Sequence, residues 1–173
     1  EMKIPEFAMP VSLIRQLSNR AQADDVLKRF NSQNVANSLW AFAKFGEMKI
    51  PEFAMPISFI TKLSNRAQAD DVLKRFNSQE VANSLWAFAK FGEMKIPEFA
   101  MPISFITKLS NRAQADDVLK RFNSQEVANS LWAFAKFGEM NIPEFAIPIS
   151  FITKLSKRAH ADDVLKRFNS QEV

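Results

Sequence analysis

Cysteine and tyrosine are absent from the 173-residue sequence, which also has only three glycines and one histidine. Without cysteine the chain has no disulfide, thiolate zinc site or thiol nucleophile. With His160 as the single histidine, we expect no histidine-based metal site or catalytic triad. So few glycines also argue against phosphate-cradling loops. The composition therefore predicts a protein that is not an enzyme and uses no metal or other cofactor.

Long apolar runs are missing as well. No stretch reaches the 18 residues of a membrane-spanning helix, and no secretory signal pattern opens the chain. We therefore predict no membrane partner. Because the sequence does not begin with methionine and stops at Val173 within an expected helix, we expect it to be part of a longer protein.

Hydrophobic residues are plentiful, at 47%, and 17 of the residues are phenylalanine. This content is sufficient for a packed core and excludes a disordered tail. The formal net charge is +4 and the pI is about 9.4. A mildly basic balance is compatible with a polyanionic partner without requiring one.

A 46-residue repeat organises the whole chain. The segment Glu-Met-Lys-Ile-Pro-Glu-Phe-Ala begins at Glu1, Glu47 and Glu93, and it returns at Glu139 with one substitution. The repeat units are 1–46, 47–92, 93–138 and a truncated 139–173, and we treat them as one array. A period of this length is typical of helical solenoids. We therefore predict an all-α, α-α superhelical solenoid.

The second unit shows the expected helices. Asn77 with Glu80 reads as a capping box before a helix over 78–91, which Gly92 ends as a left-handed C-cap. A second helix covers 56–67, either starting at Pro56 or continuing from Pro51 with a kink. A short third helix, or a continuation of the second, is expected within 69–76.

One segment of the repeat resembles the second helix of octotricopeptide repeats. It covers residues 76–92 and reads Phe-Asn-Ser-Gln-Glu-Val-Ala-Asn-Ser-Leu-Trp-Ala-Phe-Ala-Lys-Phe-Gly. The string recurs at 30–46 and 122–138. Similar helices occur in organellar proteins with a RAP domain. The resemblance implies an α-solenoid that binds single-stranded RNA in mitochondria or chloroplasts and acts in RNA processing, stability or translation.

Polar positions on the helix over 56–67 recur once per unit and would form rows along a stack. Such side chains can bond base edges or phosphates, although solvated positions also vary freely. A basic pair near the end of the short helix forms a second row, which either contacts phosphates or complements a helix dipole. The candidate RNA-binding residues are Arg15, Gln16, Asn19, Thr61, Lys62, Asn65, Thr107, Lys108, Asn111, Thr153, Lys154 and Lys157 for the first set, and Lys28, Arg29, Lys74, Arg75, Lys120 and Arg121 for the second.

Three further features have competing interpretations. Trp86 could stack on a base, but a tryptophan among leucine and phenylalanine at helical spacing is more typical of a core. For Asn83, we expect a structural hydrogen bond to a neighbouring loop in preference to contact with an RNA base. Asp70 and Asp71 point in different directions on a helix, so we expect N-capping and no acid–base pair.

Single-stranded RNA binding is the function that these features favour, with no small-molecule substrate. A protein-binding scaffold is the alternative, since helical solenoids commonly serve as one. A spacer produced by recent duplication is the third possibility. Repetition also argues against catalysis, because a catalytic site needs unlike residues converging at one place.

Overall fold

The computed structural model describes residues 11–50, 53–142 and 145–169, and every regular element within them is helical. A medium, a short and a long helix recur in each of the first three units, which confirms the all-α repeat array. The helices are α1 (Val11–Ala21), α2 (Asp24–Leu27), α3 (Ser32–Glu47), α4 (Ile57–Ala67), α5 (Asp70–Leu73), α6 (Ser78–Glu93), α7 (Ile103–Ala113), α8 (Asp116–Leu119), α9 (Ser124–Glu139), α10 (Ile149–Ala159) and α11 (Asp162–Asn169).

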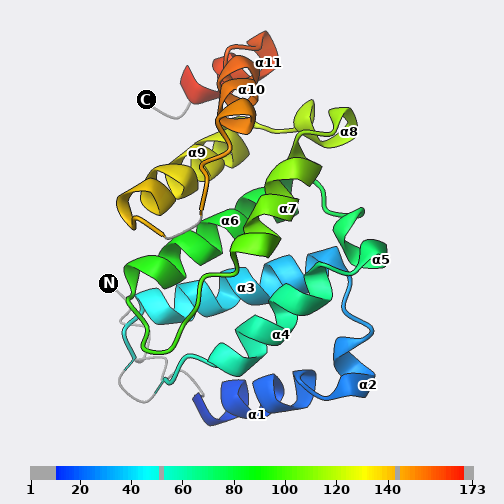
Figure 1. The fold of residues 1–173 in the computed structure, drawn as a ribbon, viewed down its shortest axis with the longest axis vertical. Coiled ribbons are helices and arrows are strands. Elements are labelled where there is room, and N and C mark those ends of the chain that lie inside the picture. The colour runs from blue at the N-terminus through cyan, green and yellow to red at the C-terminus, as the bar shows by residue number, and fades with distance from the viewer. Residues whose placement is uncertain (1–10, 51–52, 143–144, 170–173) are drawn as a thin grey trace, which may run out of the picture.

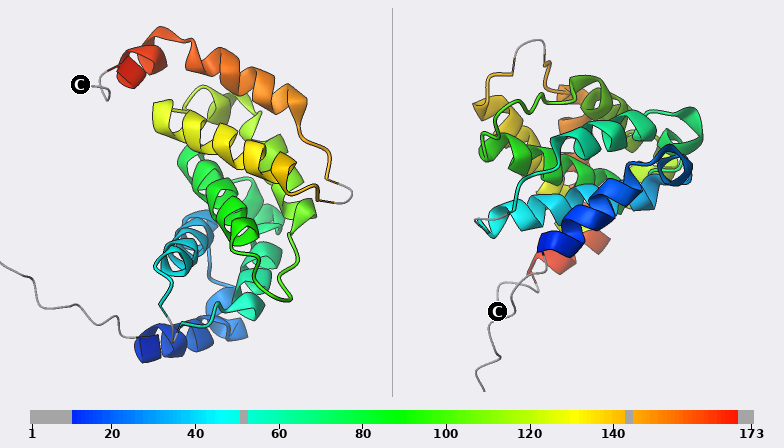
Figure 2. Two further views of the ribbon diagram at one scale, coloured as in Figure 1. Left: turned by 90° about the vertical axis from the view of Figure 1, so that its left-hand side faces the viewer. Right: turned by 90° about the horizontal axis from the view of Figure 1, so that it is seen from below.

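The helices form two layers (Figure 1). The long helices α3, α6 and α9 pack side by side in one layer, and α4, α7 and α10 form the other. In the left view of Figure 2 the array is an arc, with the long helices on its inner side and the medium helices on its outer side. We call these the inner and outer layers. Each residue position of the repeat therefore forms a row along one side of the arc.

The capping box predicted for the long helix is confirmed. The Asn77 side chain accepts a hydrogen bond from the Glu80 amide at 2.9 Å, and the Glu80 carboxylate accepts one from the Asn77 amide at 3.1 Å. This exchange satisfies two amides that would otherwise lack partners at the helix start.

The prediction that Gly92 ends this helix is wrong. The helix continues to Glu93, and the left-handed residue is Lys95, with φ of 48°. Glycine is needed for space instead. A Cβ on the equivalent Gly46 would lie 2.5 Å from the sulfur of Met94, which follows the next long helix α6, and a Cβ on Gly92 would overlap Met140.

The medium helix starts after a turn and is not kinked. Residues 53–56 of the second unit are not helical, and Pro56 is the N-cap of α4. Pro51 lies outside the described residues. The short helix α5 is confirmed, but N-capping by its aspartates is not: the N-cap is Ala69, with no side-chain hydrogen bond.

Phenylalanine side chains join the two layers. Phe88 of α6 packs edge-to-face on Phe105 of α7, with ring centroids 5.8 Å apart, and Phe76 contacts the same ring at 5.9 Å. All three rings are fully buried. Each long helix is therefore joined to the medium helix of the next unit.

Candidate nucleic-acid interface

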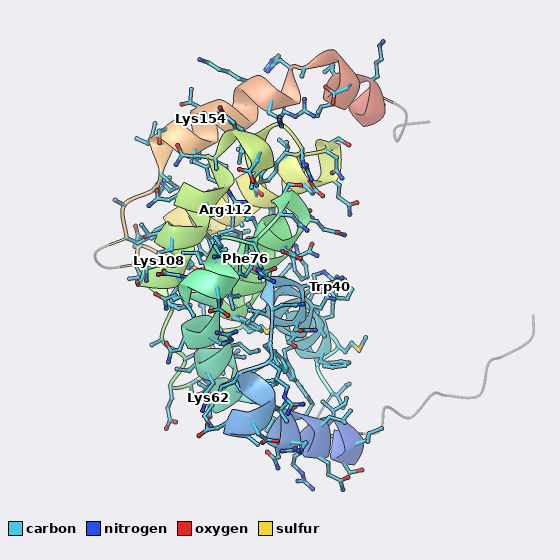
Figure 3. The ribbon with its side chains drawn as sticks, turned by 90° about the vertical axis from the view of Figure 1, so that its right-hand side faces the viewer. Trp40, Lys62, Phe76, Lys108, Arg112 and Lys154 are labelled. Atoms are coloured by element: carbon cyan, nitrogen blue, oxygen red, sulfur yellow. The ribbon has the colours of Figure 1, made fainter. Side chains whose placement is uncertain are left out.

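The predicted RNA-binding residues all lie on the surface. Every side chain of both candidate sets is exposed, from Arg15 to Lys157 in the first and from Lys28 to Arg121 in the second. In Figure 3, Lys62, Lys108 and Lys154 follow one another along the outer layer, while Trp40 lies on the opposite side. The rows expected from the repeat are thus present, and their members face solvent.

Residues of the two sets meet in a groove between consecutive units. Lys74, which follows α5, faces Lys108 and Asn111 of α7 across a groove of about 540 Å³. The next groove, of about 530 Å³, brings Lys120 of one unit to Lys154 and Lys157 of the next. Leu73 and Leu119 give the two grooves an apolar wall. Each groove thus combines ammonium groups and apolar surface with one carboxylate, from Asp70 in the first groove and Asp116 in the second.

Other predicted residues stand apart from these grooves. Four of them are exposed but line neither groove: Arg75, Arg121, Thr61 and Thr107. The hydroxyl of Thr153 donates a hydrogen bond to the Ile149 carbonyl at 2.9 Å, within its own helix. The threonine row therefore contributes less to the interface than the lysine row beside it.

An arginine that the sequence reasoning missed holds the groove wall in place. Arg66 donates from Nε to the Phe30 carbonyl of the preceding unit at 3.1 Å and forms a bidentate pair with Asp71 at 3.0 and 2.7 Å. Arg158 does the same with Phe122 and Asp163. An arginine five residues before an aspartate in every unit is the sequence signal that could have revealed this anchor.

These arginines are structural and not free cations. The side chain of Arg66 is only 19% exposed. Its hydrogen bonds, and secondarily its charge, hold the pKa of the Asp71 carboxyl below the usual value. Asp71 is therefore an ionised partner of Arg66, which leaves no carboxylic acid there for proton transfer.

On the inner layer, lysines are neutralised by carboxylates. Lys90 of α6 binds Glu47, at the end of the preceding long helix α3, at 3.1 Å and Glu93 of its own helix at 3.2 Å. Lys136 repeats this pattern with Glu93 and Glu139. By contrast, no ion pair within the described residues involves Lys74, Lys108 or Lys120. Unpaired lysines therefore line the grooves of the outer side, beside the carboxylates of Asp70 and Asp116.

The tryptophans form a ladder with these inner lysines. Lys44 lies 4.6 Å from the Trp86 ring centroid, and Lys90 lies 4.6 Å from that of Trp132. The prediction of a core tryptophan holds in part: Trp86 is half-buried and packs against the core, while Trp40 at the end of the array is 42% exposed. Each ring already has a lysine over one face, which makes it a poor platform for base stacking.

Asn83 does not have the structural role predicted for it. It is half-buried, and no hydrogen bond joins it to a neighbouring loop in the part of the chain that the structure describes.

Among the described residues, no group of three or more acidic or histidine side chains could hold a metal ion. Nor is any described helix long and apolar enough to cross a membrane.

Comparison with known proteins yields one match. A family model described as "Protein of unknown function (DUF1601)" matches residues 27–39, 73–85 and 119–131. No curated protein and no solved structure matches the chain. The three matched segments recur at the 46-residue period, and each runs from the end of a short helix into the first half of α3, α6 or α9. The chain thus shares with this family the segment that carries the helix-capping residues.

Proposed function

We propose that the array binds single-stranded RNA along its outer layer. The observation that carries the proposal is the recurring groove in which unpaired lysines of two consecutive units face each other, as Lys74 faces Lys108. Ammonium groups at regular intervals suit the regularly spaced phosphates of an extended strand.

Besides the charged side chains of Asp70, Lys74, Lys108 and Arg112, the groove has two uncharged residues that suit RNA better than a simple anion. Asn111 offers an amide that can both donate to and accept from a base edge, and Leu73 offers apolar surface to a base or sugar. Splayed bases of a single strand can reach such groups, whereas those of a duplex are stacked inside. The array is therefore proposed to favour single strands over duplexes.

The resemblance of residues 76–92 to octotricopeptide repeats supports the same ligand. It also supports a setting in mitochondria or chloroplasts, with a role in RNA processing, stability or translation. In this proposal the grooves bind the strand, and catalysis belongs to other proteins.

A salt series with fluorescently labelled RNA tests the proposal. We expect homopolymeric single strands to bind at low salt, and the logarithm of the association constant to fall linearly with that of the salt concentration, by about 0.7 per phosphate contact. Removing two groove cations with Lys74→Gln and Lys108→Gln should lower the affinity about tenfold and reduce this slope. A duplex of the same length should bind more weakly.

The matched control removes two cations elsewhere. Lys49 and Lys95 are exposed residues with positive φ, and the fourth unit carries Asn141 at the same position and in the same conformation. Lys49→Asn with Lys95→Asn should therefore fold normally and leave the affinity within about twofold, since asparagine tolerates this conformation. Absence of binding at low salt, or an equal loss in both double variants, would contradict the proposal.

A further inference from the structure

Each outer groove contains an exposed carboxylate that its lysines do not neutralise. Asp70 lines the first groove together with Lys74 and Lys108, yet no ion pair or hydrogen bond among the described residues involves its side chain. The same is true of Asp116 in the second groove. A carboxylate repels phosphate, so its presence in both grooves is not explained by contact with an RNA backbone.

The next aspartate along the chain shows what a structural carboxylate does in this array. Asp71 forms the bidentate pair with Arg66, and Asp117 forms the same pair with Arg112 at 3.0 and 2.7 Å. The pair uses the second aspartate of each Asp-Asp sequence and leaves the first one in the groove. Each unit therefore has one aspartate that holds the fold and one that is available to a ligand.

The two walls of a groove present complementary hydrogen-bonding groups. Asp70 and Lys74 are four residues apart, which places them on one side of the turn that α5 forms. Lys108 and Asn111, three residues apart on α7, line the opposite wall. One carboxylate that accepts hydrogen bonds and two ammonium groups that donate them therefore face the same space.

Guanine is the RNA base that matches this set of groups. Its N1 and N2 atoms carry adjacent N–H donors, which can bind both oxygens of one carboxylate, and its O6 and N7 atoms are adjacent acceptors that suit an ammonium group. Adenine, cytosine and uracil have no two adjacent donor atoms on one edge, so they can engage only one carboxylate oxygen. Because the carboxylate also repels phosphate, it favours a base over the backbone at this point of the groove.

We infer that each outer groove recognises a guanine of the RNA strand, with Asp70 or Asp116 accepting hydrogen bonds from N1 and N2 of the base. One lysine of the groove donates to O6 or N7, and the other contacts the backbone. The second groove has Lys157 where the first has Asn111, so the preference is assigned to the aspartate and the two lysines that both grooves contain. The inference rests on the proposed RNA binding and adds the identity of the base.

Labelled oligouridylates of about ten nucleotides, with one central nucleotide varied, test this inference on the full chain by fluorescence anisotropy. A central guanosine should bind about fivefold more tightly than adenosine, cytidine or uridine, at the low end of a bidentate contact because the groove is open to water. Inosine lacks the N2 amino group and should lose most of this advantage. 7-Deazaguanosine keeps both donors and O6, and should retain most of it.

Removal of the two groove carboxylates tests their role directly. Asp70→Asn with Asp116→Asn should reduce the guanine preference to within about twofold, because an amide cannot accept from two adjacent donors. The affinity for plain oligouridylate should rise, since two negative charges leave the binding surface. The matched control Glu98→Gln with Glu139→Gln removes the same charge from exposed residues outside both grooves and should keep the preference. Circular dichroism of each variant checks that the array remains folded.

Three results would overturn the base assignment while leaving RNA binding in place. The first is equal affinity for all four central nucleotides. The second is inosine binding as tightly as guanosine, because the N2 amino group would then make no contact. The third is a guanine preference that persists in the Asp70→Asn, Asp116→Asn variant. Absence of binding by every oligonucleotide at low salt is a different outcome, which would contradict the proposed function and the base assignment together.

Discussion

The helices α6 and α9 are a controlled comparison within one molecule, because the sequence is the same and only the neighbours differ. In α6, flanked by long helices on both sides, the buried residues include Ala82, Leu85 and Ala89 as well as Ser84 and Ala87. In α9, which has a long helix on one side only, the equivalents Ala128 and Ala135 are exposed and Leu131 is half-buried. Burial here is therefore a property of position in the array and not of the residue.

The helix α3 at the other end shows the converse. Its Ala36, Leu39 and Ala43 are buried beneath α6, while Ser38 and Ala41, which face away, are only half-buried. Together the two end helices expose the two halves of the contact that α6 makes complete. Stability in such an array is a sum of unit and neighbour contributions, so the centre and the ends should respond differently to the same substitution.

The largest difference is expected for leucine truncation. Leu85→Ala removes a fully buried side chain and should lower the free energy of unfolding by about 3 kcal/mol. Leu131→Ala, at the half-buried equivalent, should cost about 1 kcal/mol. Urea denaturation followed by circular dichroism measures both. Equal losses would contradict the view that the neighbouring helix provides the burial.

A smaller difference is expected at the two glycines near the ends of α6 and α9. In a helix, Gly→Ala stabilises by about 0.5–1 kcal/mol unless the methyl group meets an obstacle. At Gly138 the nearest atom to a Cβ is Ile147 Cδ1 at 3.3 Å, whereas at Gly92 the methyl group would overlap Met140. Thermal unfolding should therefore show Gly138→Ala more stable than Gly92→Ala by about 1 kcal/mol. The reverse order would mean that Met140 moves aside freely.

Much of the fold follows from the sequence because the repeat provides four readings of one pattern. The capping box of Asn77 and Glu80 and the short helix at Asp70 were predictable from local chemistry. The role of Gly92 was not, because a C-cap glycine and a close-packing glycine are identical in sequence. Only Met140, which lies 48 residues later at the end of the next long helix, distinguishes them. The half-buried setting of Trp86 at the edge of the core was not predictable for the same reason, since Lys44 of another unit lies over its ring.

The candidate site was predictable as rows but not as grooves. Periodicity placed Lys108 with Lys62, and Lys74 with Lys28, without showing that Lys74 faces Lys108 across a unit boundary. The contact between layers depends on how far each unit is rotated relative to the last, which side-chain packing determines.

The smallest difference is expected at the inner carboxylates. Burial raises the pKa of Glu47, but hydrogen bonds and charges from Lys44 and Lys90 outweigh it and hold the pKa below the usual 4.5. A lowered pKa contributes stability that is present above the unfolded-state value and is lost as the pH falls through the folded-state value. Glu47→Gln should therefore lower the free energy of unfolding by under about 1 kcal/mol at neutral pH and flatten the decline in stability between about pH 5 and pH 3.

Glu139, paired with Lys136 alone among the described residues, is the control at the end of the array. Glu139→Gln should change the pH profile less, and equal profiles for the two variants would show that Lys90, the lysine from the next long helix, adds nothing to the pair with Glu47.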